Sequence, residues 1–130
     1  MGDGNYPPDH IDVVQYVTAR VSELRKQCTF SDPKALQIIT GYGRSMLPTF
    51  SDGDPLLVDT SVKDVELDAV YAFTFDGKFY IKGLQRIPRA GLRVLSHNRD
   101  ENEPWDISIE NMPLLSVHGR VILAWNTRRL

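Results

Sequence analysis

Ser45 has the surroundings of a serine that could act as a nucleophile. It follows a stretch with two glycines, Gly41 and Gly43, and comes shortly before Pro48. A serine on such a sharply directed bend can present its hydroxyl beside free backbone N–H groups, which is what an oxyanion hole requires. A single serine more commonly caps a short turn, and the residues alone leave that interpretation open.

Lys82 is the candidate base. Removal of a lysine ammonium from water lowers its pKa, so a desolvated lysine can be neutral near neutral pH. A neutral amine could accept the proton of a serine hydroxyl and later return it to a leaving amine. A lysine in a strand usually faces solvent, so the catalytic interpretation requires burial of Lys82.

The segment around Lys82 predicts a β-hairpin. Asp76-Gly77 suits a two-residue type I′ turn between strands 69–75 and 78–87. In that register Lys82 faces Tyr71 and shares a strand face with Tyr80 and Leu84, a largely apolar neighbourhood. The same register pairs two further sets of residues: Phe75 with Lys78, and Phe73 with Tyr80.

The remaining pattern predicts a mostly β fold. Short apolar or alternating runs, separated by turn signals such as Asp52-Gly53 and Ala90-Gly91, occupy residues 36–39, 56–58, 92–96, 107–109 and 117–125. Many short strands with few helices indicate a compact, highly bent, barrel-like antiparallel sheet. One short N-terminal helix is expected over residues 22–28, capped by Ser22, and residues 11–20 fit a helix or a strand equally.

The composition is that of one globular domain. The 130 residues carry a net charge of −2, with 42% hydrophobic and 25% charged residues. This charge argues against DNA binding by this part of the chain, because DNA-binding domains usually carry a basic patch. No apolar stretch is long enough to span a membrane and no signal-peptide pattern is present, so we expect a soluble, cytoplasmic protein.

No residue pattern predicts a metal or another cofactor. The single cysteine, Cys28, has no companions for a disulfide or a metal site, and we interpret it as a partly buried structural thiol. The histidines have no ligand-like spacing: His10, His97 and His118. Three aspartates near Gly53 are explained by turn chemistry rather than by a cation: Asp52, Asp54 and Asp59.

Several motifs in order resemble the C-terminal peptidase domain of LexA-like and phage-type repressors. They are Gly-x-Ser-Met-x-Pro-Thr at 43–49, Asp-Gly-Asp at 52–54, Asp-x-Val-Tyr-x-Phe at 68–73 and Tyr-Ile-Lys at 80–82. The segments 92–98 and 117–125 are similar to the later part of that domain. The resemblance covers roughly residues 36–125, which is most of the chain.

The resemblance implies a Ser–Lys peptidase that cleaves its own chain. Ser45 would attack the carbonyl, buried neutral Lys82 would serve as base and then acid, and the backbone N–H groups of Ser45 and Met46 would hold the oxyanion. Family members cut the linker to an N-terminal DNA-binding domain when a RecA–single-stranded-DNA filament stabilises the cleavable conformer, in the DNA-damage response. They also form homodimers or higher oligomers through this domain, and DNA is bound only through the N-terminal domain.

The chain also departs from a complete repressor. No helix-turn-helix precedes the β region, so we interpret residues 1–10 as an extended arm left from the cleavage region and residues 11–130 as the peptidase and dimerisation domain. Met1-Gly2 stands where a scissile pair is expected and is a candidate remnant of it. Arg44 occupies a position where relatives often carry Asp, which puts the rate and the inducibility of cleavage in question.

Two other functions fit the same sequence. One is a dimerisation domain that never cleaves and whose repression is relieved by an antirepressor protein. The other is an accessory subunit of a mutagenesis polymerase, similar to UmuD, which shares the fold and the dyad. Signal peptidases share the Ser-Met-x-Pro-Thr string, but their membrane anchor and apolar docking surface are missing from this sequence.

Overall fold

The computed structural model describes residues 28–98, 100 and 103–126. Seven strands form one sheet, and all of its strand pairs are antiparallel. In chain order the strands are β1 (Leu36–Thr40), β2 (Pro55–Asp59), β3 (Ala69–Phe75), β4 (Lys78–Ile87), β5 (Gly91–Leu95), β6 (Trp105–Ser108) and β7 (Leu115–Ala124). The fold is therefore mostly β, as the sequence predicts.

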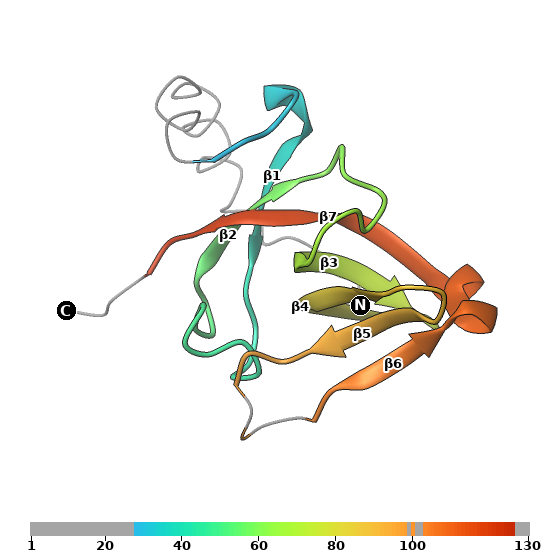
Figure 1. The fold of residues 1–130 in the computed structure, drawn as a ribbon. Helices are drawn as coiled ribbons and strands as arrows, with labels where there is room; N and C mark the ends of the chain where they lie inside the picture. The colour runs from blue at the N-terminus through green and yellow to red at the C-terminus, as the bar shows by residue number, and fades with distance from the viewer. Residues whose placement is uncertain (1–27, 99, 101–102, 127–130) are drawn as a thin grey trace.

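The strands lie in the order β1-β2-β7-β3-β4-β5-β6. The last strand, β7, thus lies between β2 and β3 and joins a β1–β2 hairpin to the β3–β6 meander. Figure 1 shows β7 arcing across the molecule, with the other strands turning away from it rather than lying in one flat layer. The register shifts on both sides of β7, between Leu57 and Val58 and between Ala72 and Phe73, and such irregularities bend a sheet.

The β3–β4 hairpin has the register that its turn residues predict. Tyr71 pairs with Lys82, and Phe75 pairs with Lys78. Asp76 and Gly77 have φ angles of 50° and 82°, both in the left-handed region that a type I′ turn requires. The turn therefore fixes which β4 side chains share a face with Lys82.

Side chains from both faces of the bent sheet form the core. One group of buried residues surrounds Tyr71 and Phe73 and includes Leu84, Leu92, Val94 and Ile107. A second group lies between β1, β2 and the loop after β1: Ile39, Met46, Phe50, Leu56, Val58 and Ala72. The second group includes Met46, so the residue after Ser45 is anchored in the core.

Two 3-10 helices were not predicted, and several strand ends differ from the prediction by one or two residues. η1 covers Pro33–Ala35, where the Asp32 carboxylate accepts a hydrogen bond from Lys34 N. η2 covers Ile109–Leu114, so the strand predicted over residues 107–109 ends at Ser108 instead. The helix predicted over residues 22–28 and the arm 1–10 lie outside the described residues, apart from Cys28.

The Ala90-Gly91 pair lies at the turn between β4 and β5, as predicted. Gly91 has a φ of 122°, and a Cβ added there would lie 2.0 Å from the carbonyl oxygen of Ile107. No other residue could bring β5 this close to β6 without moving the backbone. The glycine at this turn therefore allows β5 and β6 to pair closely at Gly91 and Ser108.

Candidate active site

Ser45 lies in the loop between β1 and β2. The base of this loop is closed by two backbone hydrogen bonds, from Gly41 N to Asp54 O at 2.8 Å and from Gly53 N to Gly41 O at 2.7 Å. Within the loop, Leu47 N donates to Arg44 O at 3.2 Å, so Ser45 occupies a central position of a tight turn. The serine itself is half-buried.

The N–H groups beside Ser45 are available to a ligand. Among the hydrogen bonds of the described residues, neither Ser45 N nor Met46 N donates to a protein acceptor. The Met46 side chain is only 1% exposed and packs against Phe50 and Leu56. This anchor holds the peptide unit of Met46 in place, and an oxyanion hole needs such fixed N–H donors.

Lys82 lies near the middle of β4 and is half-buried. Desolvation lowers the pKa of its ammonium, and the like charge of Lys78 lowers it further. Tyr71, its partner across the ladder, is 1% exposed. The predicted apolar surroundings of Lys82 are therefore present, although burial of the side chain is partial rather than complete.

The Lys82 ammonium donates a hydrogen bond of 2.8 Å to the hydroxyl of Ser96. Ser96 directly follows β5, whose residue Leu95 pairs with Gly83. One further step along this antiparallel register places Ser96 opposite Lys82. Lys82 thus lies between a buried tyrosine on one side and a serine hydroxyl on the other.

The segment after β5 also contacts the Ser45 loop. Asn98 N donates to Ser45 O at 2.8 Å, and the Asn98 side-chain amide donates to Arg44 O at 2.9 Å. The His97 ring is hydrogen-bonded to the Thr49 hydroxyl in the same loop. Residues 96–98 therefore bind Lys82 at one end and the serine loop at the other.

This arrangement attaches Lys82 and the Ser45 loop to the same segment, residues 96–98. In the part of the chain that the structure describes, no hydrogen bond joins the Ser45 hydroxyl to the Lys82 amine. Lys82 is hydrogen-bonded to Ser96, and Asn98, two residues later, donates its N–H to the carbonyl oxygen of Ser45. Ser96 and Asn98 were not predicted as site residues. The sequence placed Ser96 at the end of a predicted strand and Asn98 in the polar stretch after it, and both belong to the segment 92–98 that resembles the family domain.

Within the described part of the chain, none of the interactions found for the other candidate residues involves Ser45 or Lys82. Met1, Gly2 and His10 lie outside the described residues. His118 Nε2 is 2.7 Å from the hydroxyl of Thr74, so His118, like His97, is hydrogen-bonded to a threonine. Cys28 is partly buried, and desolvation raises the pKa of its thiol.

The aspartates near Gly53 stabilise turns. Asp52 Oδ1 accepts from Gly43 N at 2.7 Å, and Asp54 Oδ2 accepts from Ser51 N at 2.8 Å. Asp59 accepts from both the N–H and the hydroxyl of Ser61. Among residues 28–98, 100 and 103–126, no group of three or more His, Cys, Asp or Glu side chains could hold a metal ion.

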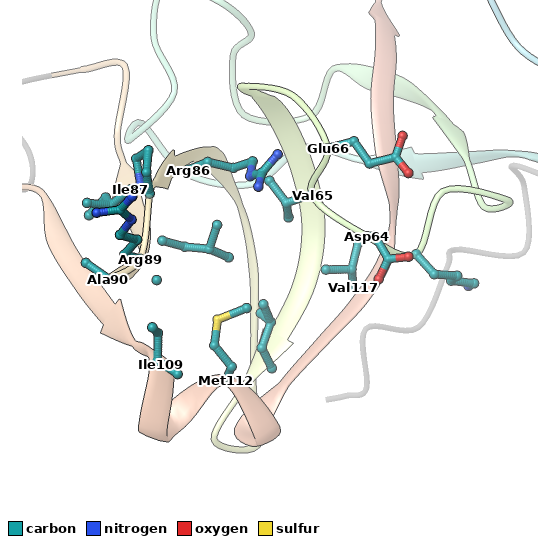
Figure 2. A pocket seen from close by; sticks show the side chains of 15 residues that line it. Asp64, Val65, Glu66, Arg86, Ile87, Arg89, Ala90, Ile109, Met112 and Val117 are labelled. Atoms are coloured by element: carbon teal, nitrogen blue, oxygen red, sulfur yellow. The ribbon is translucent and has the colours of Figure 1, made fainter.

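A hollow of about 570 Å³ lies elsewhere on the molecule. Its lining comes from residues 63–66, the β4–β5 turn, η2 and the start of β7. Figure 2 shows Arg86 and Arg89 on one side of it and Asp64 and Glu66 across from them, above the Met112 side chain. Neither Ser45 nor Lys82 lines this hollow, so it is distinct from the candidate active site.

Comparison with known proteins identifies relatives over most of the chain. The Peptidase S24-like family matches residues 5–122. The HTH-type transcriptional regulator PrtR of Pseudomonas aeruginosa is 33% identical over 97 residues, which are 75% of this chain and 35% of that protein. An HTH-type transcriptional regulator of Haemophilus influenzae is 32% identical over 80 residues, which are 62% of this chain and 33% of that protein.

The chain thus spans about a third of the length of the curated relatives it matches. Within the described residues, no helix is long and apolar enough to cross a membrane.

Proposed function

This chain belongs to the Peptidase S24-like family, and on that premise we propose that it is a serine peptidase domain with Ser45 as nucleophile and Lys82 as general base. The observation that carries the proposal is the shared attachment of both residues to the segment 96–98. Ser96 accepts a hydrogen bond from Lys82, and Asn98 N donates to Ser45 O. Desolvation of Lys82 supplies the lowered pKa that a lysine base requires.

In the proposed reaction the Ser45 hydroxyl attacks a peptide carbonyl and passes its proton to the neutral amine of Lys82. The negative charge on the carbonyl oxygen is stabilised by the N–H groups of Ser45 and Met46, which have no protein acceptor among the described residues. Lys82 then gives its proton to the leaving amine as the C–N bond breaks. Water hydrolyses the resulting ester, with Lys82 again as the base.

The proposed substrate is the protein's own chain. The curated relatives are HTH-type transcriptional regulators about three times as long as the matched region. We therefore propose a repressor whose DNA-binding part lies outside this chain, with this domain as the dimerisation module. Cleavage of the linker, promoted by a RecA–single-stranded-DNA filament during the DNA-damage response, would separate the two parts and end repression. The arm with Met1 and Gly2 remains a proposed remnant of that linker.

The test is cleavage of the full-length protein in its host after mitomycin treatment. We expect two fragments on a blot from the wild type and none from Ser45→Ala or Lys82→Ala. Two matched controls, Ser51→Ala in the same loop and Lys34→Ala on the surface, should cleave like the wild type. An intact wild-type chain throughout induction contradicts self-cleavage under these conditions and favours the second candidate.

The second candidate is a dimerisation domain whose dyad is never productive, with repression relieved by an antirepressor protein. It is favoured by the absence, among the described residues, of a direct Ser45–Lys82 hydrogen bond. Alkaline treatment of the purified full-length protein separates the two candidates, because a competent dyad should cleave without any partner. A UmuD-like accessory role is excluded if the gene encodes a helix-turn-helix upstream of this domain.

A further inference from the structure

We propose that Ser96 is a positioning residue, whose hydroxyl holds the Lys82 amine in place for proton transfer with Ser45. The inference rests on the proposed Ser–Lys chemistry and concerns how the base is oriented. Lys82 Nζ lies 2.8 Å from Ser96 Oγ. In the described part of the chain this is the hydrogen bond that the Lys82 side chain makes.

Backbone pairing between β4 and β5 brings Lys82 and Ser96 close together. Lys82 lies within β4, and the β4–β5 pairing ends at Gly83 and Leu95, so Ser96 stands directly across from the lysine. Both residues are half-buried. A lysine side chain has many rotamers, and ordering it costs conformational entropy. An acceptor immediately after the neighbouring strand selects the lysine rotamers in which the amine lies near the end of β5.

The same short segment orders the nucleophile. Asn98 makes two hydrogen bonds to consecutive carbonyl groups in the serine loop, those of Arg44 and Ser45, at 2.9 and 2.8 Å. Ser96 and Asn98 are separated by one residue, and His97 between them bonds to Thr49. Ser96, His97 and Asn98 therefore link the base, Lys82, to the loop that carries the nucleophile, Ser45.

A hydroxyl suits this role better than a carboxylate does. It carries no charge, so it can accept an N–H from Lys82 without strongly favouring the ammonium form over the neutral amine. While Ser96 accepts one N–H, the lone pair of the neutral amine can point elsewhere, toward the Ser45 proton. That proton moves from Ser45 Oγ to Lys82 Nζ and then to the leaving amine, and Ser96 keeps its own proton throughout.

Four variants of the full-length protein test the inference, through the rate of self-cleavage measured from pH 7 to 11. We expect Ser96→Ala to cleave about tenfold more slowly, the equivalent of one lost hydrogen bond. Ser96→Thr keeps the hydroxyl and should stay within about twofold of the wild type. Ser96→Asp should move the midpoint of the pH profile upward, since an adjacent negative charge favours the ammonium. Ser116→Ala, an exposed serine on β7, is the matched control.

A second measurement follows Lys82 without any cleavage. In a Ser45→Ala background, the NMR shift of the Lys82 side-chain Cε reports its titration directly. We expect the Lys82 pKa to change with Ser96→Asp and to stay close to the parent value with Ser96→Thr. If Ser96→Ala changes neither the rate nor the Lys82 signal, Ser96 has no positioning role.

The two proposals fail in different ways. A Ser96→Ala rate above the wild-type rate overturns the positioning role, because it means that Ser96 withholds the lysine from Ser45. A wild-type protein that never cleaves, even in alkali, refutes the proposed function. In that case the Cε titration still decides whether Ser96 holds Lys82.

Discussion

Tyr71 and Lys82 are direct partners across the β3–β4 ladder, and the tyrosine hydroxyl donates a hydrogen bond of 2.7 Å to Leu67 O. Tyr71 is 1% exposed, whereas Lys82 beside it is half-buried. The ring therefore forms one wall of the lysine's surroundings, while its hydroxyl fastens the loop that leads into β3. Burial also raises the pKa of Tyr71, so it remains an uncharged donor into alkaline solution.

Replacement of Tyr71 by Phe tests this double role. The ring and its burial are kept, but Leu67 O loses its donor, so we expect a loss of about 0.5–1.5 kcal/mol in the free energy of unfolding. Urea denaturation measures it. Tyr80→Phe is a suitable control, because the Tyr80 hydroxyl makes no hydrogen bond among the described residues. Equal losses in both variants would show that the Leu67 bond contributes nothing.

The pH dependence of self-cleavage should report the titration of Lys82. Because desolvation and Lys78 lower the Lys82 pKa, we expect the rate to rise with pH to a midpoint below the ordinary lysine value of 10.5. Lys78→Gln removes one like charge and should shift the midpoint upward, less so at high salt because Lys78 is exposed. A rate that stays flat from neutral to about pH 10 argues against a lysine base.

Lys82 should also destabilise the folded domain at neutral pH. The Lys82 pKa is lower in the folded state than the ordinary lysine value of 10.5. Between these two pKa values the unfolded chain binds more protons, so stability rises with pH. Lys82→Met keeps the apolar stem and removes the charge, and it should therefore raise the urea midpoint at pH 7. The gain should shrink above about pH 10.5, where lysine is neutral in both states. A destabilised Lys82→Met variant would mean that the hydrogen bond to Ser96 outweighs desolvation.

His118 should make the domain sensitive to acid. Its ring is held by the Thr74 hydroxyl and lies against Phe79, with centroids 5.8 Å apart, while Lys63 donates to its carbonyl oxygen. Desolvation, followed by the charge of Lys63, lowers the His118 pKa from 6.5. The unfolded state then binds more protons, so stability should fall as pH drops below about 6.5.

His118→Gln retains a hydrogen-bonding group without this titration. We expect its thermal midpoint to decline less between pH 6.5 and 5 than that of the wild type. His97 also has a pKa lowered by desolvation, so part of the acid sensitivity should persist in the variant. An unchanged pH dependence would assign the whole effect to other groups.

The sequence predicted the hairpin that carries Lys82 because its information is local. Asp76 and Gly77 adopt the positive φ angles that their turn requires, and strand alternation then determines which side chain faces Tyr71. The existence of all seven strands followed from the same short-range patterns. Several of their ends differ by one or two residues, and Ile109, which ends the run predicted over residues 107–109, is the first residue of a 3-10 helix instead.

The contacts of Ser96 and Asn98 could not be predicted in this way. Each joins residues far apart in the chain, Ser96 to Lys82 and Asn98 to Ser45, and depends on how the loop after β1 packs on the end of β5. Nothing in the local pattern of Leu-Ser-His-Asn specifies that packing. The identification of Ser45 likewise depended on resemblance, since a serine in a turn has many ordinary roles.

The place of β7 in the sheet has a consequence for the order of events during synthesis. Ser45 belongs to the loop joining β1 and β2, Lys82 lies in β4, and the strand inserted between these two halves is made last among the seven. A ribosome-bound chain that lacks residues 115–124 can form hairpins but has no partner to bridge Leu57 to Phe73. If the chain cleaves itself as proposed, its catalytic competence should therefore be delayed until the final strand emerges, which would protect the nascent polypeptide from premature self-cleavage.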